Sequence, residues 1–248
     1  MSETEILVVV VAMLLGAVVK GAVGAGLPTI AIPVMAGFIG VVDAVVIMAI
    51  PTVVTNTWLV ARHRRALDQT RDLPVLLVTG GIGVVLGAWI LDRVAPAWLM
   101  FTLAAVIVLY AAVFLTRPTF EISPDTSRLL APPMGSAAGL LQGATGMSGA
   151  LLTTYTHALR LPRPAFMVQL VTQIQVFTVV QVASFALLGL YDTERLLGSL
   201  LAIVPALVGL PLGMRLGTRL PPRPFELLVL VVLGGMAIKL VVDGIGAL

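Results

Sequence analysis

Two glycine-rich stretches carry the residues of this chain best suited to bind a small anion. The first runs from Lys20 to Gly26 and the second from Gln142 to Gly149, and each interrupts an apolar segment. Matching breaks in two halves are the best sequence indication of the binding site in a transporter built from repeats. Unwound backbone at membrane depth has to line a polar cavity or be buried in protein. We therefore expect the two breaks to meet around one solute.

Each break is expected to start a short helix whose N-terminal N–H groups face the middle of the bilayer. Pro28 suits the first turn of such a helix, and a helix N-terminus attracts anions. Lys20 adds a charge that is costly, and by default functional, inside a membrane. The matching position is the neutral Gln142, and Ser148 is expected as an N-cap or a direct ligand. The alternatives are close helix packing by small residues and, for Lys20, snorkelling to the interface.

Further polar side chains fall inside apolar segments of both halves. Gln169 and Gln173 share one face of a helix expected at 165–190, and Asn56 belongs to a polar face in the first half. Amides and hydroxyls at membrane depth line a cavity or tie helices together. The expected substrate-binding residues are Lys20, Gly24, Gly26, Thr29, Asn56, Gln142, Thr145, Gly146, Ser148, Gln169 and Gln173.

The chain offers little for catalysis or for metal chemistry. It has no cysteine, which excludes disulfides, thiolate metal sites and thiol catalysis. It has only two histidines. No H-E-x-x-H, G-x-S-x-G or P-loop pattern occurs. We therefore expect no enzyme, no metal and no cofactor. The net charge of +3 is small and the arginines lie in short loops, where they set membrane topology rather than bind nucleic acid.

The elements that position these residues require a lipid bilayer as solvent. The 248 residues are 59% hydrophobic and 11% charged, with a mean hydropathy of +1.09, whereas soluble domains carry about 25% charged residues. We expect an all-α polytopic membrane protein. A spanning helix needs about 20 apolar residues. The expected full spans are 41–60, 73–91, 97–116, 165–190, 196–216 and 225–247, and the segments too short to span are 6–19, 27–38, 133–142 and 150–159.

A second set of matching residues, besides the two glycine-rich stretches, indicates that the two halves of the chain arose by duplication. Gly83, Gly87, Arg93 and Pro96 match Gly209, Gly213, Arg219 and Pro222 at one constant offset. The predicted units are repeats at 1–116 and 133–248 with a cytoplasmic linker at 117–132. Each repeat should hold a broken or re-entrant helix pair plus three transmembrane helices. Inverted repeats with both termini outside place most of the 15 Lys and Arg in the cytoplasm, and parallel repeats are the alternative.

The doubled glycine motif, Gly21–Gly26 followed by Pro28 and Pro33, and then Gly143–Gly149, resembles the TauE/SafE sulfite exporter-like family, the TSUP anion permeases. The resemblance covers nearly the whole chain. It implies a secondary transporter, by expectation an exporter, that moves sulfite or an organosulfonate across the inner membrane by alternating access around a midplane site. The alternative functions left open are an anion channel, a carboxylate carrier, and a membrane enzyme or assembly factor. Whether the chain works as a homodimer is also left open.

Overall fold

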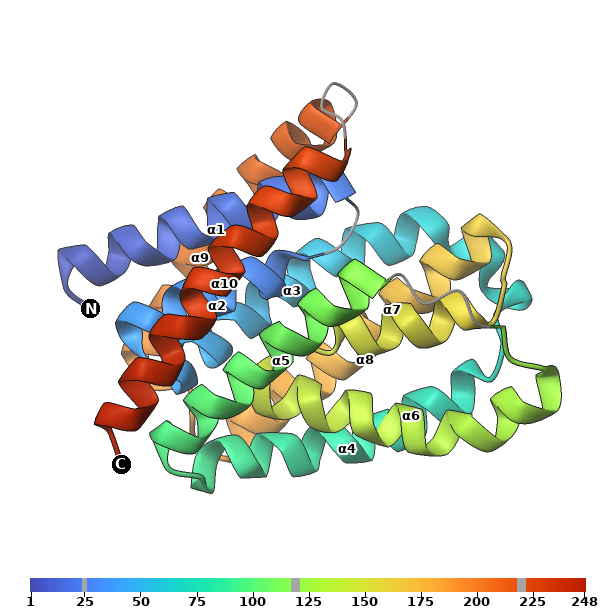
Figure 1. Cartoon of the computed structure of the whole chain (residues 1–248), viewed down its shortest axis with the longest axis horizontal. Helices are drawn as coiled ribbons and strands as arrows, with labels where there is room; N and C mark the ends of the chain where they lie inside the picture. Colours follow the sequence, from blue (N-terminus) through green and yellow to red (C-terminus); the bar gives the residue numbers. More distant parts are fainter. Residues whose placement is uncertain (24–25, 117–120, 218–221) are drawn as a thin grey trace.

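A computed structural model describes residues 1–23, 26–116, 121–217 and 222–248 (Figure 1), and describes their side chains except at 23, 62–65, 217 and 222–228. Within these ranges the regular structure is helical. The helices are α1 (Glu3–Val23), α2 (Leu27–Ile39), α3 (Val41–His63), the 3-10 helix η1 (Arg64–Gln69), α4 (Leu73–Arg93), α5 (Pro96–Thr116), α6 (Pro124–Thr145), α7 (Gly149–Ala158), α8 (Arg163–Leu187), α9 (Thr193–Gly217) and α10 (Pro222–Gly246).

In the described part of the chain, seven helices are long and apolar enough to cross a membrane: α1, α3, α4, α5, α8, α9 and α10. The expected all-α polytopic membrane protein is therefore confirmed. Six of these helices occupy the spans that the apolar runs predicted. The inverted arrangement of two repeats stays a prediction.

The first break was expected between two short helices, but α1 is a full-length helix of 21 residues. It starts earlier than predicted because Ser2 and Glu5 form a reciprocal cap: Ser2 N donates to Glu5 Oε2 at 2.7 Å, and Glu5 N donates to Ser2 Oγ at 3.3 Å. It also continues through Gly21 to Val23, so Gly21 is helical rather than part of the break.

The second break is likewise preceded by a long helix instead of the short segment expected at 133–142. Helix α6 has 22 residues and starts at Pro124, inside the region predicted as a linker. Ser123 caps it by accepting a hydrogen bond from Thr126 N at 3.2 Å, and proline suits the first turn. Charged residues and the Pro132–Pro133 pair made this stretch resemble a linker. The short second members of each pair, α2 and α7, have 13 and 10 residues, as predicted.

The long first helix of each predicted half packs against a later helix of the other half. Helix α1 contacts α9 and α4 contacts α6 more extensively than any other pairs of elements. A β-carbon on Gly21 would lie 2.9 Å from Gly213 Cα, and one on Gly143 would lie 2.8 Å from Gly87 Cα. These glycines therefore serve close helix packing, which was the structural alternative for the glycine-rich stretches.

The largest cluster of buried apolar side chains occupies the part of the bundle nearest the chain termini, which lie at the same end (Figure 1). Met13, Ile32, Met35 and Met48 are among its fully buried side chains, and they come from α1, α2 and α3. The residues at the starts of the two short helices are buried: Leu27 of α2 and Ser148 directly before α7. These two N-termini therefore lie inside the protein.

Candidate functional site

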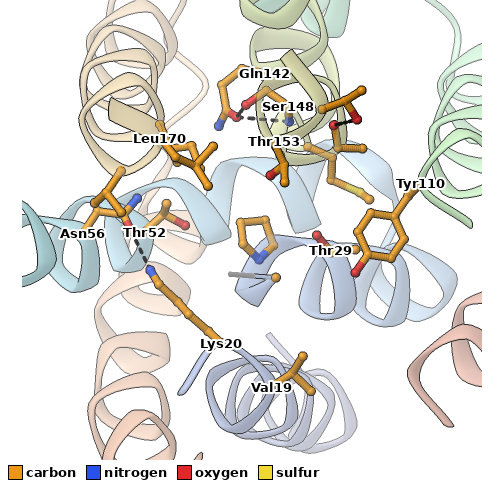
Figure 2. A pocket seen from close by; sticks show the side chains of 18 of the residues that line it. Val19, Lys20, Thr29, Thr52, Asn56, Tyr110, Gln142, Ser148, Thr153 and Leu170 are labelled. Atoms are coloured by element: carbon orange, nitrogen blue, oxygen red, sulfur yellow. Dashed lines mark hydrogen bonds between the residues drawn. The ribbon is translucent and has the colours of Figure 1, made fainter. Parts of the chain in front are cut away.

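A pocket of about 660 Å³ lies between the two chain breaks. Gly26, which precedes α2, and Gly146 to Gly149, which precede α7, both line it. The remaining walls come from α1, α2, α3, α5, α6, α7, α8 and α10. The structure thus brings the two glycine-rich stretches to one internal space, where side chains from both halves face each other (Figure 2).

Lys20 is the charged residue of this pocket. Its side chain is 5% exposed, and its Nζ donates to Asn56 Oδ1 at 2.5 Å and to Thr55 Oγ1 at 3.0 Å (Figure 2). Both partners are neutral, and the described residues place no carboxylate within salt-bridge distance of Lys20. An ammonium group has three N–H donors, so one N–H of Lys20 remains available after these two hydrogen bonds. Burial of Lys20 contradicts the snorkelling alternative.

Asn56 is the second donor on this side of the pocket. Its side chain is 3% exposed, and Nδ2 has no hydrogen-bond partner, while Oδ1 accepts from Lys20. An unpaired buried amide N–H costs free energy comparable to a lost hydrogen bond. Thr29 on α2 and Thr52 on α3 also line the pocket, although Thr52 Oγ1 donates to Met48 O at 2.9 Å. On this wall Lys20 and Asn56 therefore present hydrogen-bond donors, whereas Thr52 has used its hydroxyl proton and can only accept.

Gln142 and Ser148 form the opposite part of the pocket lining. Ser148 Oγ donates to Gln142 Oε1 at 2.6 Å, and Gln142 Nε2 donates to Gln181 Oε1 at 3.0 Å. Ser148 is the N-cap residue of α7, as expected, but its side chain makes no capping hydrogen bond. A side chain that caps a helix belongs to a residue with extended backbone, whereas Ser148 has helical φ and ψ of −91° and −10°. Its hydroxyl is therefore aimed at α6 instead of the first turn of α7.

Two of the predicted glycines are required by backbone conformation. Gly26 has a φ of +108° and Gly146 a φ of +69°, both in the left-handed region that favours glycine. A β-carbon on Gly146 would also lie 2.5 Å from Ile32 Cδ1. Gly26 directly precedes α2, and Gly146 is the C-cap of α6. Gly24, also predicted, lies outside the described residues.

Three predicted binding residues do not line the pocket. Thr145 Oγ1 accepts from Met147 N at 3.2 Å and so shapes the turn after α6. Gln169 pairs with the backbone of Arg71, accepting from its N at 2.9 Å and donating to its O at 3.0 Å. Gln173 is fully buried, and neither atom of its amide has a partner. Gln169 and Gln173 share one face of α8, while Leu170 and Ile174 line the pocket.

The predicted set also omitted residues that line the pocket. Thr153, Thr154 and His157 come from the polar stretch of α7, and that polarity was the signal that could have found them. Tyr110 comes from α5, where it is one of four aromatic residues in an apolar helix and gives no signal of its own. Among the described residues, no group of three or more histidines and carboxylates could hold a metal ion.

A protein-family model described as "Sulfite exporter TauE/SafE" matches residues 8–240. The match includes both chain breaks and every residue that lines the pocket. No curated protein and no solved structure gives a significant match to this chain.

Proposed function

The chain belongs to the TauE/SafE sulfite exporter family, and on this premise we propose that it is a secondary transporter of a small sulfur-containing anion such as sulfite or an organosulfonate. We place it in the inner membrane of a cell, with export as the direction of transport. The pocket between the two chain breaks is the proposed substrate site. Its substrate-binding residues are Lys20, Gly26, Thr29, Asn56, Gln142, Gly146 and Ser148.

The observation that carries this proposal is a buried lysine without a counter-charge. Lys20 is the only Lys, Arg, Asp or Glu among the described residues that line the pocket. Lys239, which also lies in an apolar helix, has Asp243 Oδ2 at 2.6 Å from its Nζ. Buried charges are normally paired because desolvation of a lone charge is costly. A singly charged anion would supply the missing partner of Lys20, and Asn56 Nδ2 would supply a further hydrogen bond.

The helix pairs supply a route to alternating access. Glycine contacts hold α1 against α9 and α4 against α6 at backbone distance, which favours movement of each pair as a unit. The substrate site lies between these pairs, at the breaks that follow α1 and α6. Rocking of one pair against the other would open the pocket first to one side of the membrane and then to the other.

Sulfite flux into liposomes containing the purified protein tests the proposal. Lys20→Gln removes the charge that the anion would meet, and a hydrogen bond to a charged group contributes about 1.5–3 kcal/mol. We therefore expect sulfite to bind about 10- to 100-fold more weakly, with a matching fall in flux at low sulfite concentration. Lys239→Gln is the matched control, because it changes a lysine in another apolar helix away from the pocket.

The wild-type and variant fluxes separate two conclusions. Absence of sulfite flux through the wild-type protein, shown to be folded by size-exclusion chromatography, would contradict sulfite transport. Flux that is equal in wild-type protein and in Lys20→Gln would remove Lys20 from the substrate site. A loss in Lys20→Gln together with normal flux in Lys239→Gln supports the anion site at the chain breaks.

A further inference from the structure

We propose that Ser148 accepts a hydrogen bond from the transported anion, so that the site favours a singly charged sulfur oxyanion that carries an O–H or N–H donor of its own. This inference rests on the proposed function. It follows from a chain of buried hydrogen bonds that fixes which atoms of Gln181, Gln142 and Ser148 donate and which accept.

The chain begins at Gln181 on α8, whose amide is held by backbone carbonyls. Its Nε2 lies 2.6 Å from Gln142 O and 3.5 Å from Gly143 O. A carbonyl oxygen can only accept a hydrogen bond, so the NH2 group of Gln181 has to face these two atoms. The Oε1 atom of Gln181 therefore faces the side chain of Gln142 as an acceptor.

The orientation of Gln142 follows from that of Gln181. Gln142 Nε2 donates to Gln181 Oε1 at 3.0 Å and to Thr178 Oγ1 at 3.5 Å. Thr178 can accept here because its hydroxyl donates to Ile174 O at 2.7 Å. Gln142 Oε1 then points to Ser148, lying 2.6 Å from its Oγ and 3.4 Å from its N.

Ser148 has one hydroxyl proton, and the bond to Gln142 Oε1 uses it. What the hydroxyl still offers to the pocket is its remaining lone pairs, which can only accept. Among the groups that face the pocket, Lys20 and Asn56 thus donate from α1 and α3, while Ser148 accepts beside α7 (Figure 2). A ligand without a hydrogen-bond donor would leave the buried acceptor of the site unpaired. The site therefore discriminates strongly against such a ligand.

The negative group of the substrate accordingly belongs near Lys20, and a donor of the substrate belongs near Ser148. Hydroxyalkanesulfonates and hydrogen sulfite have this combination, whereas simple alkanesulfonates and fully deprotonated sulfite do not. A pocket of about 660 Å³ has room for the two-carbon members of this class.

Two sulfonates that differ in one hydroxyl group test the inference. Isethionate (2-hydroxyethanesulfonate) and ethanesulfonate are both monoanions, and their Kd values can be measured by isothermal titration calorimetry on the full chain in lipid nanodiscs. We expect the wild-type protein to bind isethionate about fivefold more tightly, the factor that one neutral hydrogen bond gives. In Ser148→Ala the ratio of the two Kd values should fall to about one, mainly through weaker binding of isethionate.

Gln181→Leu tests the positioning step, because it frees the Gln142 amide to turn and the Ser148 hydroxyl to donate. The same loss of discrimination is expected there, with ethanesulfonate still bound. The matched controls are Ser199→Ala, where the buried hydroxyl donates to Arg195 O, and Gln175→Leu on the same helix, where the amide donates to Thr57 Oγ1. Both controls should keep the wild-type ratio. Ser148→Ala keeps the inference testable if Gln181→Leu does not fold.

Equal Kd values for the two sulfonates in the wild-type protein would overturn the inference while leaving sulfite transport in place. If Ser148→Ala kept the wild-type ratio of the two Kd values, the inference would likewise be overturned and sulfite transport would stand. Binding of neither sulfonate, with sulfite flux that depends on Lys20, would exclude this substrate class and so overturn the inference alone. Absence of both sulfonate binding and sulfite flux would overturn the proposed function and the inference together.

Discussion

Gly87 lies in the contact between α4 and α6, and its replacement by alanine measures how much this contact stabilises the fold. A β-carbon at Gly87 would overlap Leu140 O and would lie 2.8 Å from Ala144 N and 2.9 Å from Gly143 Cα. All three neighbours are backbone atoms of α6, so no change of side-chain rotamer relieves the overlap. The two helices would have to move apart along their whole contact.

The expected magnitude follows from two opposing effects. Overpacking of a close contact costs about 1–3 kcal/mol, and alanine gains up to about 1 kcal/mol over glycine inside a helix. Gly87→Ala should therefore lose up to about 2 kcal/mol of unfolding free energy. Gly81→Ala, on the same helix, is the matched control because its β-carbon would meet nothing within 4 Å. That variant should show only the gain in helix propensity.

Thermal unfolding of the purified variants in one detergent measures both effects. A change of 1 kcal/mol shifts the melting temperature of a chain of this size by about 2–4 °C. Gly87→Ala should consequently melt several degrees below Gly81→Ala, and the wild-type protein should lie between them. Equal melting temperatures for the two variants would refute the close packing of α4 on α6.

The remaining predictions concern the polar face of α8 that does not meet the pocket. Gln169→Leu removes both hydrogen bonds to the Arg71 backbone and should cost about 1–3 kcal/mol of unfolding free energy. We expect a lower melting temperature with an unchanged ratio of isethionate to ethanesulfonate affinity, and an unchanged melting temperature would contradict the pairing. Gln173→Leu replaces a buried amide that has no partner, so it should raise stability by about 1 kcal/mol. A fall in its melting temperature would show that Gln173 is hydrogen-bonded in the folded protein.

The glycine-rich stretches were found from sequence because their signal is local. Gly26 and Gly146 need a positive φ, and Pro28 marks the start of the next helix, so residues within one turn of each break identify it. The beginnings of α1 and α6 were missed for the opposite reason. Capping by Ser2 and Ser123 let each helix start in polar sequence that hydropathy alone assigns to a tail or a linker.

Part of the pocket lining was predicted from the sequence. Lys20 and Gln142 line the pocket as expected. A polar residue directly before a break in an apolar helix has to be buried in protein or line a polar cavity. Gln169 and Gln173 were predicted from the density of amides on α8, but periodicity does not say which neighbour a polar face meets. Gln181, which holds Gln142 in place, was not among the predicted residues.

Sequence alone determined that this chain lies in a bilayer as apolar helices interrupted at two glycine-rich breaks. It could do so because backbone polar groups in lipid have to be satisfied within the segment itself, which leaves a strong record in composition and in glycine and proline positions. The tertiary structure decided that α1 packs on α9 and α6 on α4, that Lys20 has only neutral partners, and that the Ser148 hydroxyl donates to Gln142. Those outcomes depend on the rotation of each helix about its axis, which is set by contacts with segments distant in the chain.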